Sequence, residues 1–144
     1  MRFTLAHELG HHFLGHARYL SLDTYDEDDF EGQVGHLLSL TDIARLEWQA
    51  NRFAACLLMP RRQFLHQFRL LLEDHDIKDR GYGLLYVDSQ PCNLETFGSI
   101  CSGLSCAFRV SFGAVAVRLK VLGLLNDQRL SSPSTVIRLQ ENRR

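Results

Sequence analysis

Two histidines and a glutamate near the start of the chain have the types and the spacing of a catalytic metal site. His7-Glu8-Leu9-Gly10-His11 is an H-E-x-x-H motif. On a helix, His7 and His11 lie one above the other on the same face, so both imidazoles can reach one metal ion. Glu8 lies about 100° around the helix, close enough to hold a water molecule without binding the metal itself. The chemistry that this pattern favours is attack of an activated water on a carbonyl group.

The alternative interpretation is a set of ordinary polar residues on a solvent-facing helix. It fits less well because the apolar residues Leu5, Leu9 and Phe13 are interleaved with the motif. Two histidines and a glutamate inside an apolar helix are typical of a zinc site.

A catalytic zinc ion needs a third protein ligand and keeps a fourth position for water. His16 is the nearest candidate in the sequence. The motif that recruits a third histidine, H-E-x-x-H-x-x-G-x-x-H, requires glycine at position 14 and histidine at position 17. Leu14 and Ala17 stand there instead. We therefore expect His12 and His16 to lie at the surface or around the ligands.

Glu47 is a better candidate for the third ligand. It lies in Glu47-Trp48-Gln49-Ala50-Asn51-Arg52-Phe53, inside an apolar helical pattern where a lone carboxylate is costly. Asn51, one turn later, shares its face and can hydrogen-bond the outer nitrogen of a ligating histidine, which fixes the orientation of such ligands. The alternative is an exposed Glu47 that pairs with Arg45 or Arg52.

Apolar periodicity predicts the elements that position these residues. We expect the first helix over residues 2–15, ending near Gly15, and the second over 39–59, begun by Ser39 or Thr41 and ended by Pro60. Three more helices are predicted over 61–75, 94–108 and 112–122. Residues 76–93 read as a loop with one short strand within 84–87.

Composition bounds the class of protein. The 144 residues, 45% of them hydrophobic, fit one globular domain, and 16 basic against 17 acidic side chains argue against a dedicated nucleic-acid binder. No apolar run approaches a membrane span or the core of a signal peptide, so we expect a cytoplasmic protein. The acidic stretch Asp23–Glu31 predicts a surface loop, with a calcium cage as the alternative. Cys101 and Cys106 are expected to be buried or half-buried free thiols.

Two segments resemble the signature segments of the ImmA/IrrE family of metallo-endopeptidases. They are RFTLAHELGHHFLGH and EWQANRFAACLLMP, the second matching approximately E-x-x-A-N-x-F-A-x-x-L-L-M-P, and FRVSFGAVAVRLKVLGLL is similar to a downstream helical region. The resemblance implies His7, His11 and Glu47 as zinc ligands and Glu8 as general base, with Asn51 at the recurrent A-N position. It implies a mainly α, zincin-like helical core with little sheet over residues 1–125. The composition of the remaining residues, rich in Ser and Arg from Leu130, predicts a flexible tail over 126–144.

The resemblance also implies a function. Family members typically cleave helix-turn-helix repressors in bacteria, often those of mobile elements or stress responses, and so release the controlled genes. We therefore expect a zinc-dependent endopeptidase with a protein partner and with no direct nucleic-acid or membrane partner. The alternative is a non-catalytic or truncated regulatory protein that binds a repressor without cleaving it. DNA binding by the helix pair at 94–122 is disfavoured because its second helix carries only Arg118 and Lys120 as basic residues.

Two departures from the family pattern bear on the site. The acidic stretch lengthens the connection between the signature segments, and the H-E-x-x-H motif begins only six residues after Met1. Family members normally have tens of residues before it, including strands of a sheet, which predicts an N-terminally truncated domain. No single residue is indicated as the stabiliser of an oxyanion. The available groups are Tyr82, Tyr86, His66 and His75.

Overall fold

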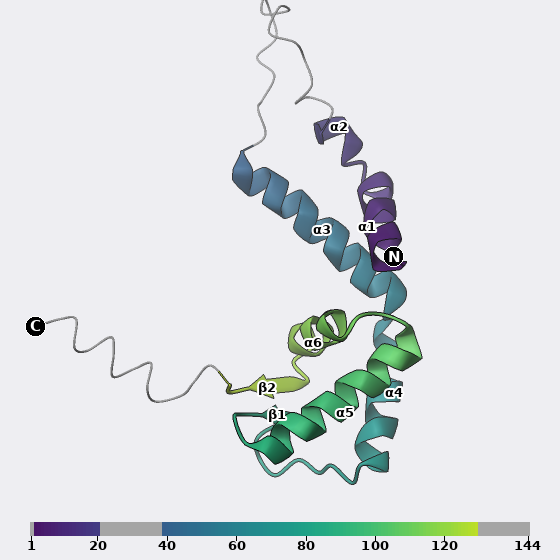
Figure 1. Cartoon of the computed structure of the whole chain (residues 1–144). Coiled ribbons are helices and arrows are strands. Elements are labelled where there is room, and N and C mark those ends of the chain that lie inside the picture. Colours follow the sequence, from purple (N-terminus) through teal and green to yellow (C-terminus); the bar gives the residue numbers. More distant parts are fainter. Residues whose placement is uncertain (1, 21–38, 130–144) are drawn as a thin grey trace, which may run out of the picture. The chain divides into compact units, whose positions relative to one another are not determined.

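The structure, a computed structural model, describes residues 2–20 and 39–129 (Figure 1). Within these ranges the chain forms helices α1 to α6 and one sheet of two strands, which confirms the mainly α fold class. The residues group into two compact units, Met1–Pro60 and Arg61–Arg144. The acidic stretch Asp23–Glu31 lies outside the described residues, as does the segment from residue 130 to 144.

The first unit contains α1 (Arg2–Phe13), α2 (Ala17–Leu20) and α3 (Leu40–Leu58). Ser39 begins α3 with a capping box. Its hydroxyl accepts a hydrogen bond from the backbone N–H of Asp42, whose carboxylate accepts one from the N–H of Ser39. Pro60 ends the helix because proline disfavours the helical conformation at the residue before it. The prediction of a helix over 39–59 is confirmed to within one residue at each end.

α1 ends earlier than the predicted residue 15, in a tight turn around Gly15. Gly15 has a left-handed backbone with φ of 72°. Its N–H donates to the carbonyl oxygen of His12 at 3.1 Å, and the N–H of His16 donates to that of His11 at 3.0 Å. These two bonds define a Schellman motif, in which the chain folds back over the last turn of the helix. The turn thereby places His16 beside His11.

Small residues bring α1 and α3 into close contact. Ala6 on α1 is 3% exposed, and Ala50 and Ala54 on α3 are fully buried. A β-carbon added to Gly10 would lie 3.1 Å from both the Cα and the carbonyl oxygen of Ala50. α1 runs alongside α3 (Figure 1). Because the two backbones are so close, short and medium-length side chains from one helix reach those of the other.

The second unit contains α4 (Arg61–Asp74), β1 (Leu85–Val87), α5 (Pro91–Phe108), α6 (Phe112–Val121) and β2 (Leu125–Asp127). All three helices predicted in this part of the chain are confirmed. α5 begins three residues earlier than predicted because Pro91 occupies its first turn, where a missing N–H costs nothing. The core is made of buried apolar side chains: Phe64, Phe68, Leu85, Val87, Ile100, Leu104, Val115 and Leu119.

β1 and β2 pair in parallel, with Leu85 opposite Leu125 and Val87 opposite Asp127. The sequence predicts the first of these strands but places residues 126 and 127 in a tail. They are strand instead, because the Asp127 carboxylate holds β2 in place by accepting from Lys120 of α6 at 2.8 Å and from Arg129 at 2.7 Å. The rest of the expected tail, from residue 130, lies outside the described residues.

α5 and α6 form a bent apolar pair. Arg109, with a left-handed φ of 52°, caps the C-terminus of α5, and the Ser111 hydroxyl caps the start of α6 by accepting from the N–H of Ala114. Among the described helices none is long and apolar enough to cross a membrane alone, and α5 with α6 passes that test only as a pair bent by 104°. On α6, Arg118 is buried and Lys120 pairs with Asp127.

The cysteine predictions are half right. Cys101 is buried in the core, as expected, whereas Cys106 is exposed. Both belong to α5, but Cys101 follows the buried Ile100 while Cys106 lies two residues after the buried Leu104. On a helix, two residues correspond to a rotation of roughly 200°, which turns Cys106 to solvent.

Candidate metal centre

His7 and His11 lie one turn apart on α1, and their rings meet edge to face at an interplanar angle of 65°. The ring centroids are 4.7 Å apart, and the two Nε2 atoms are 3.0 Å apart. Their side chains are 18% and 14% exposed, so each imidazole is largely shielded but has access to solvent. α1 therefore presents two nitrogen donors at one point of its surface.

Glu47 of α3 reaches the same point from the neighbouring helix. Its two carboxylate oxygens lie 3.3 Å from the Nε2 of His7 and 3.3 Å from the Nε2 of His11. The three residues form the group that could hold a metal ion among the described residues. Glu47 itself is 48% exposed, so one side of the group is open to solvent.

The donor set fits a zinc ion. The two Nε2 atoms are 3.0 Å apart, and each lies 3.3 Å from a different oxygen of the Glu47 carboxylate. With one ligand atom taken from each residue, the three atoms lie within 4.8 Å of one another. Two imidazoles and one carboxylate with an open side are the donors of a catalytic rather than a structural zinc site. The three side chains thus have the donor types that zinc takes and are gathered closely enough to converge on one ion.

The outer nitrogens of the two histidines have different partners. The Nδ1 of His7 lies 3.1 Å from the Oδ1 of Asn51, one turn after Glu47 on α3. The Nδ1 of His11 lies 3.0 Å from the Nδ1 of His16. The contact expected of Asn51 is therefore present in the structure, and His16 makes a second such contact.

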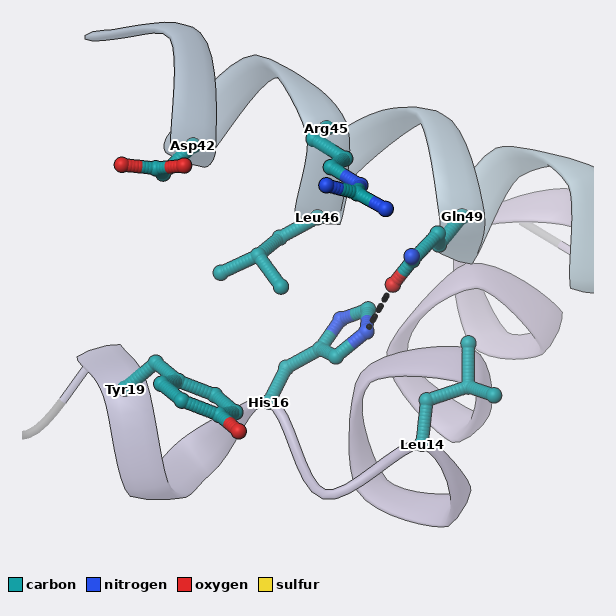
Figure 2. Close-up of a pocket in the computed structure, with 7 residues that line it drawn as sticks. All are labelled: Leu14, His16, Tyr19, Asp42, Arg45, Leu46 and Gln49. Carbon is teal, nitrogen blue, oxygen red and sulfur yellow. Dashed lines mark hydrogen bonds between the residues drawn. The ribbon is translucent and has the colours of Figure 1, made fainter. Parts of the chain in front are cut away.

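His16 is 2% exposed and is held from both sides. Its Nε2 lies 3.0 Å from the Oε1 of Gln49, the bond drawn in Figure 2. The ring forms part of the wall of a cleft of about 320 Å³ between the end of α1, α2 and the first half of α3. The residues that line this cleft are Leu14, His16, Tyr19, Asp42, Arg45, Leu46 and Gln49.

Glu8 and His12 lie outside this group. Glu8 follows His7 on α1 with an exposed side chain, about 100° around the helix from it. His12 is exposed, and its ring packs edge to face with that of the neighbouring Phe13, with centroids 5.5 Å apart. The groups considered as oxyanion stabilisers belong to the second unit: His66, His75, Tyr82 and Tyr86.

Comparison with known proteins identifies the family of the chain. Residues 1–120 match the Peptidase M78 family, described as the IrrE N-terminal-like domain. The chain belongs to this family. Membership confirms the resemblance to ImmA/IrrE proteins, indicates a metallopeptidase and implies a metal ion. No curated protein and no solved structure matches the chain.

Sequence reasoning about this Peptidase M78 chain did not single out the His16–Gln49 contact. The signal that could have found it is Gly15 followed by His16, four and five residues after His11. A glycine just beyond the last helical residue predicts a Schellman turn, and that turn carries the next residue back over the helix. A histidine at that place can contact the side chain five residues earlier, as His16 contacts His11.

Proposed function

We propose that the protein is a zinc-dependent endopeptidase. The observation that supports this most strongly is the convergence of His7, His11 and Glu47 at mutual distances of 3.0 and 3.3 Å, with one side exposed. The family match supports the same class of activity. In this proposal the two Nε2 atoms and the Glu47 carboxylate hold the ion.

Zinc, when bound, lowers the pKa of water toward about 7 and polarises the scissile carbonyl. The residues of the chain transfer the proton and orient the metal ligands. The exposed carboxylate of Glu8, next to His7 on α1, accepts a proton from the attacking water and returns it to the amine that leaves. Asn51 accepts a hydrogen bond from the Nδ1–H of His7, which keeps the Nε2 lone pair of that ring directed at the ion.

For the substrate, we propose a helix-turn-helix transcriptional repressor. The support is the similarity of the two signature segments to those of the ImmA/IrrE proteins, together with the family match over residues 1–120. The same similarity supports control of a mobile element or of a stress response.

The test incubates the zinc-loaded protein with purified helix-turn-helix repressors from the same genome and examines the products by mass spectrometry. We expect a repressor to be cut at a defined bond. Glu8→Gln should retain zinc and lose about 10²–10⁴-fold in cleavage rate, the usual contribution of a general base. Glu95→Gln, which changes an exposed carboxylate on α5, is the matched control and should cut normally. A stable complex without fragments would favour a binding protein, and equal cleavage by Glu8→Gln would exclude the proposed base.

A further inference from the structure

A buried histidine beside the metal centre has no role in the chemistry proposed above. His16 is 2% exposed, although histidine is more often only partly buried. Its two ring nitrogens both have partners within 3.0 Å, one on α1 and one on α3. A buried imidazole with two hydrogen-bond contacts restricts the orientation of its partners, and one of these partners is His11.

The backbone delivers His16 to this position. The left-handed Gly15, at φ 72°, lets the N–H of His16 return to the carbonyl oxygen of His11. In Schellman turns the residue at this place frequently makes an apolar contact with the helix. Here the two imidazoles meet instead, with ring centroids 4.9 Å apart at an interplanar angle of 79° and the two Nδ1 atoms 3.0 Å apart.

The two Nε2 atoms of His7 and His11 can share a metal ion, but the Nδ1 atoms of His11 and His16, 3.0 Å apart, need one hydrogen between them. If the Nε2 of His11 offers its lone pair to a metal ion, the hydrogen of its neutral ring must be on Nδ1. That hydrogen points at the Nδ1 of His16, which must then carry none and act as the acceptor. The hydrogen of His16 is consequently on Nε2, where the carbonyl oxygen of Gln49 accepts it at 3.0 Å.

The opposite arrangement would disable the ligand. If Gln49 turned its amide nitrogen toward His16, the hydrogen of His16 would be on Nδ1 and would point at the Nδ1 of His11. His11 would then accept there and carry its own hydrogen on Nε2, the atom 3.3 Å from Glu47. The oxygen of Gln49 therefore determines which nitrogen of His11 is available to the ion. Figure 2 shows this oxygen directed at the His16 ring.

We propose that His16 and Gln49 are positioning residues that hold His11 in its metal-binding tautomer and orientation. His7 has a direct amide partner in Asn51, whereas His11 has a two-step chain that ends on the same helix, α3. α3 thus supplies one ligand and the outer support of both others. The inference rests on the proposed zinc site and adds two residues to it.

The first test measures zinc affinity by competition with a chelating dye, without reference to peptide cleavage. His16→Phe keeps a ring of similar shape but offers no acceptor, and it should weaken zinc binding about 10–100-fold, as loss of such supporting contacts does elsewhere. Gln49→Leu should act in the same direction, whereas Gln49→Glu keeps an acceptor oxygen and should restore the affinity. His12→Phe, the matched control, changes the exposed neighbouring histidine and should leave the affinity unchanged.

The second test reads the tautomers directly by long-range proton–nitrogen NMR of the zinc-loaded, histidine-labelled protein. We expect hydrogen on Nδ1 of His11 and on Nε2 of His16, a pattern that a purely structural role would not require. Hydrogen on Nδ1 of His16, or unchanged zinc affinity in both His16→Phe and Gln49→Leu, would overturn the inference. The tautomer assignment needs no variant, so it decides the matter even if His16→Phe does not fold. Absence of zinc binding by the unaltered protein would overturn the proposed function and this inference together.

Discussion

Gly10 of α1 lies so close to Ala50 of α3 that a β-carbon at residue 10 would come within 3.1 Å of the Ala50 backbone. Such a separation is shorter than ordinary van der Waals contact, and backbone atoms cannot rotate away as a side chain does. The glycine therefore sets the distance between the two helices. That distance in turn allows Glu47 to reach His7 and His11.

Gly10→Ala tests this spacing. The added methyl group should push α1 from α3, and the cost of overpacking, about 1–3 kcal/mol, exceeds the roughly 1 kcal/mol that alanine gains over glycine in a helix. We expect weaker zinc binding and a lower free energy of unfolding of the first unit. Urea unfolding followed by the fluorescence of Trp48, the one tryptophan of the chain, reports on this unit.

Gly98→Ala on α5 is the control for that experiment. Nothing lies within 4 Å of a β-carbon added there, so only the gain in helix propensity remains. We expect the free energy of unfolding of the second unit to rise by about 0.5–1 kcal/mol. If Gly10→Ala were as stabilising as Gly98→Ala and left zinc affinity intact, the close approach of the two helices would be refuted.

Asn51 should matter for metal binding through His7 alone. Asn51→Leu removes the oxygen 3.1 Å from the Nδ1 of His7 and should weaken zinc binding about 10-fold or more. Asn51→Asp keeps an acceptor oxygen and should bind zinc at least as well as the unaltered protein. Calorimetric titration with zinc compares the three proteins, with the exposed Gln63→Ala on α4 as control. Equal zinc affinities for Asn51→Leu and the control would show that Asn51 does not support metal binding.

Asp127 should make the stability of the second unit fall in acid. Hydrogen bonds from Arg129, and then from Lys120, hold the pKa of the Asp127 carboxyl well below its ordinary value of 3.8. The stabilisation is therefore complete above about pH 5 and is lost as the pH falls through 3.8 toward the lower folded-state pKa. Asp127→Asn should lower the free energy of unfolding at pH 7 by about 1–2 kcal/mol, between the values for exposed ion pairs and charged hydrogen bonds.

The measurement for Asp127 is urea unfolding by circular dichroism between pH 2 and pH 7. The unaltered protein should lose stability below about pH 4 more steeply than Asp127→Asn. Asp74→Asn, which changes an exposed carboxylate at the end of α4, should keep the steep decline. Parallel curves for the unaltered protein and Asp127→Asn would contradict the role given to this ion-pair group.

Cys101 should be the unreactive thiol of the chain. Burial raises the pKa of its thiol to about 12, so it stays protonated as well as shielded. The other cysteines, Cys56, Cys92 and Cys106, are exposed. A chromogenic disulfide reagent should modify three thiols in the folded protein and the fourth only in denaturant. Rapid modification of all four under native conditions would show that Cys101 is accessible.

Much of the first unit follows from local signals in the sequence. Ser39 and Pro60 mark the ends of α3, and the four-residue spacing of His7 and His11 puts them on one face of α1. The sequence predicts Glu47 as the partner of the two histidines, and the three side chains do converge. The burial argument for Glu47 is wrong, because its side chain is 48% exposed. These signals act over one or two helical turns, which is why they can be read without knowledge of the tertiary structure.

The buried face of α1 was harder to predict. Leu5 and Phe13, which suggest burial by their type, are 64% and 69% exposed, whereas Ala6 and Gly10 form the buried contact with α3. Hydrophobicity favours the larger side chains as core, but a close helix crossing is made by small ones. The buried position of His16 and the strand β2 were not predicted for a related reason. His16 depends on a chain reversal and β2 on pairing with a distant strand, and the periodicity of apolar residues predicts neither.

The zinc content of the protein tests the central claim most directly. After dialysis against zinc and then against metal-free buffer, the unaltered protein should keep one zinc ion per chain. Glu8→Gln should keep it as well, because the claim makes Glu8 a base and not a ligand, whereas Glu47→Gln should lose it. The claim would be contradicted by an unaltered protein that keeps no zinc, or by a Glu47→Gln variant that holds zinc as tightly as the unaltered chain.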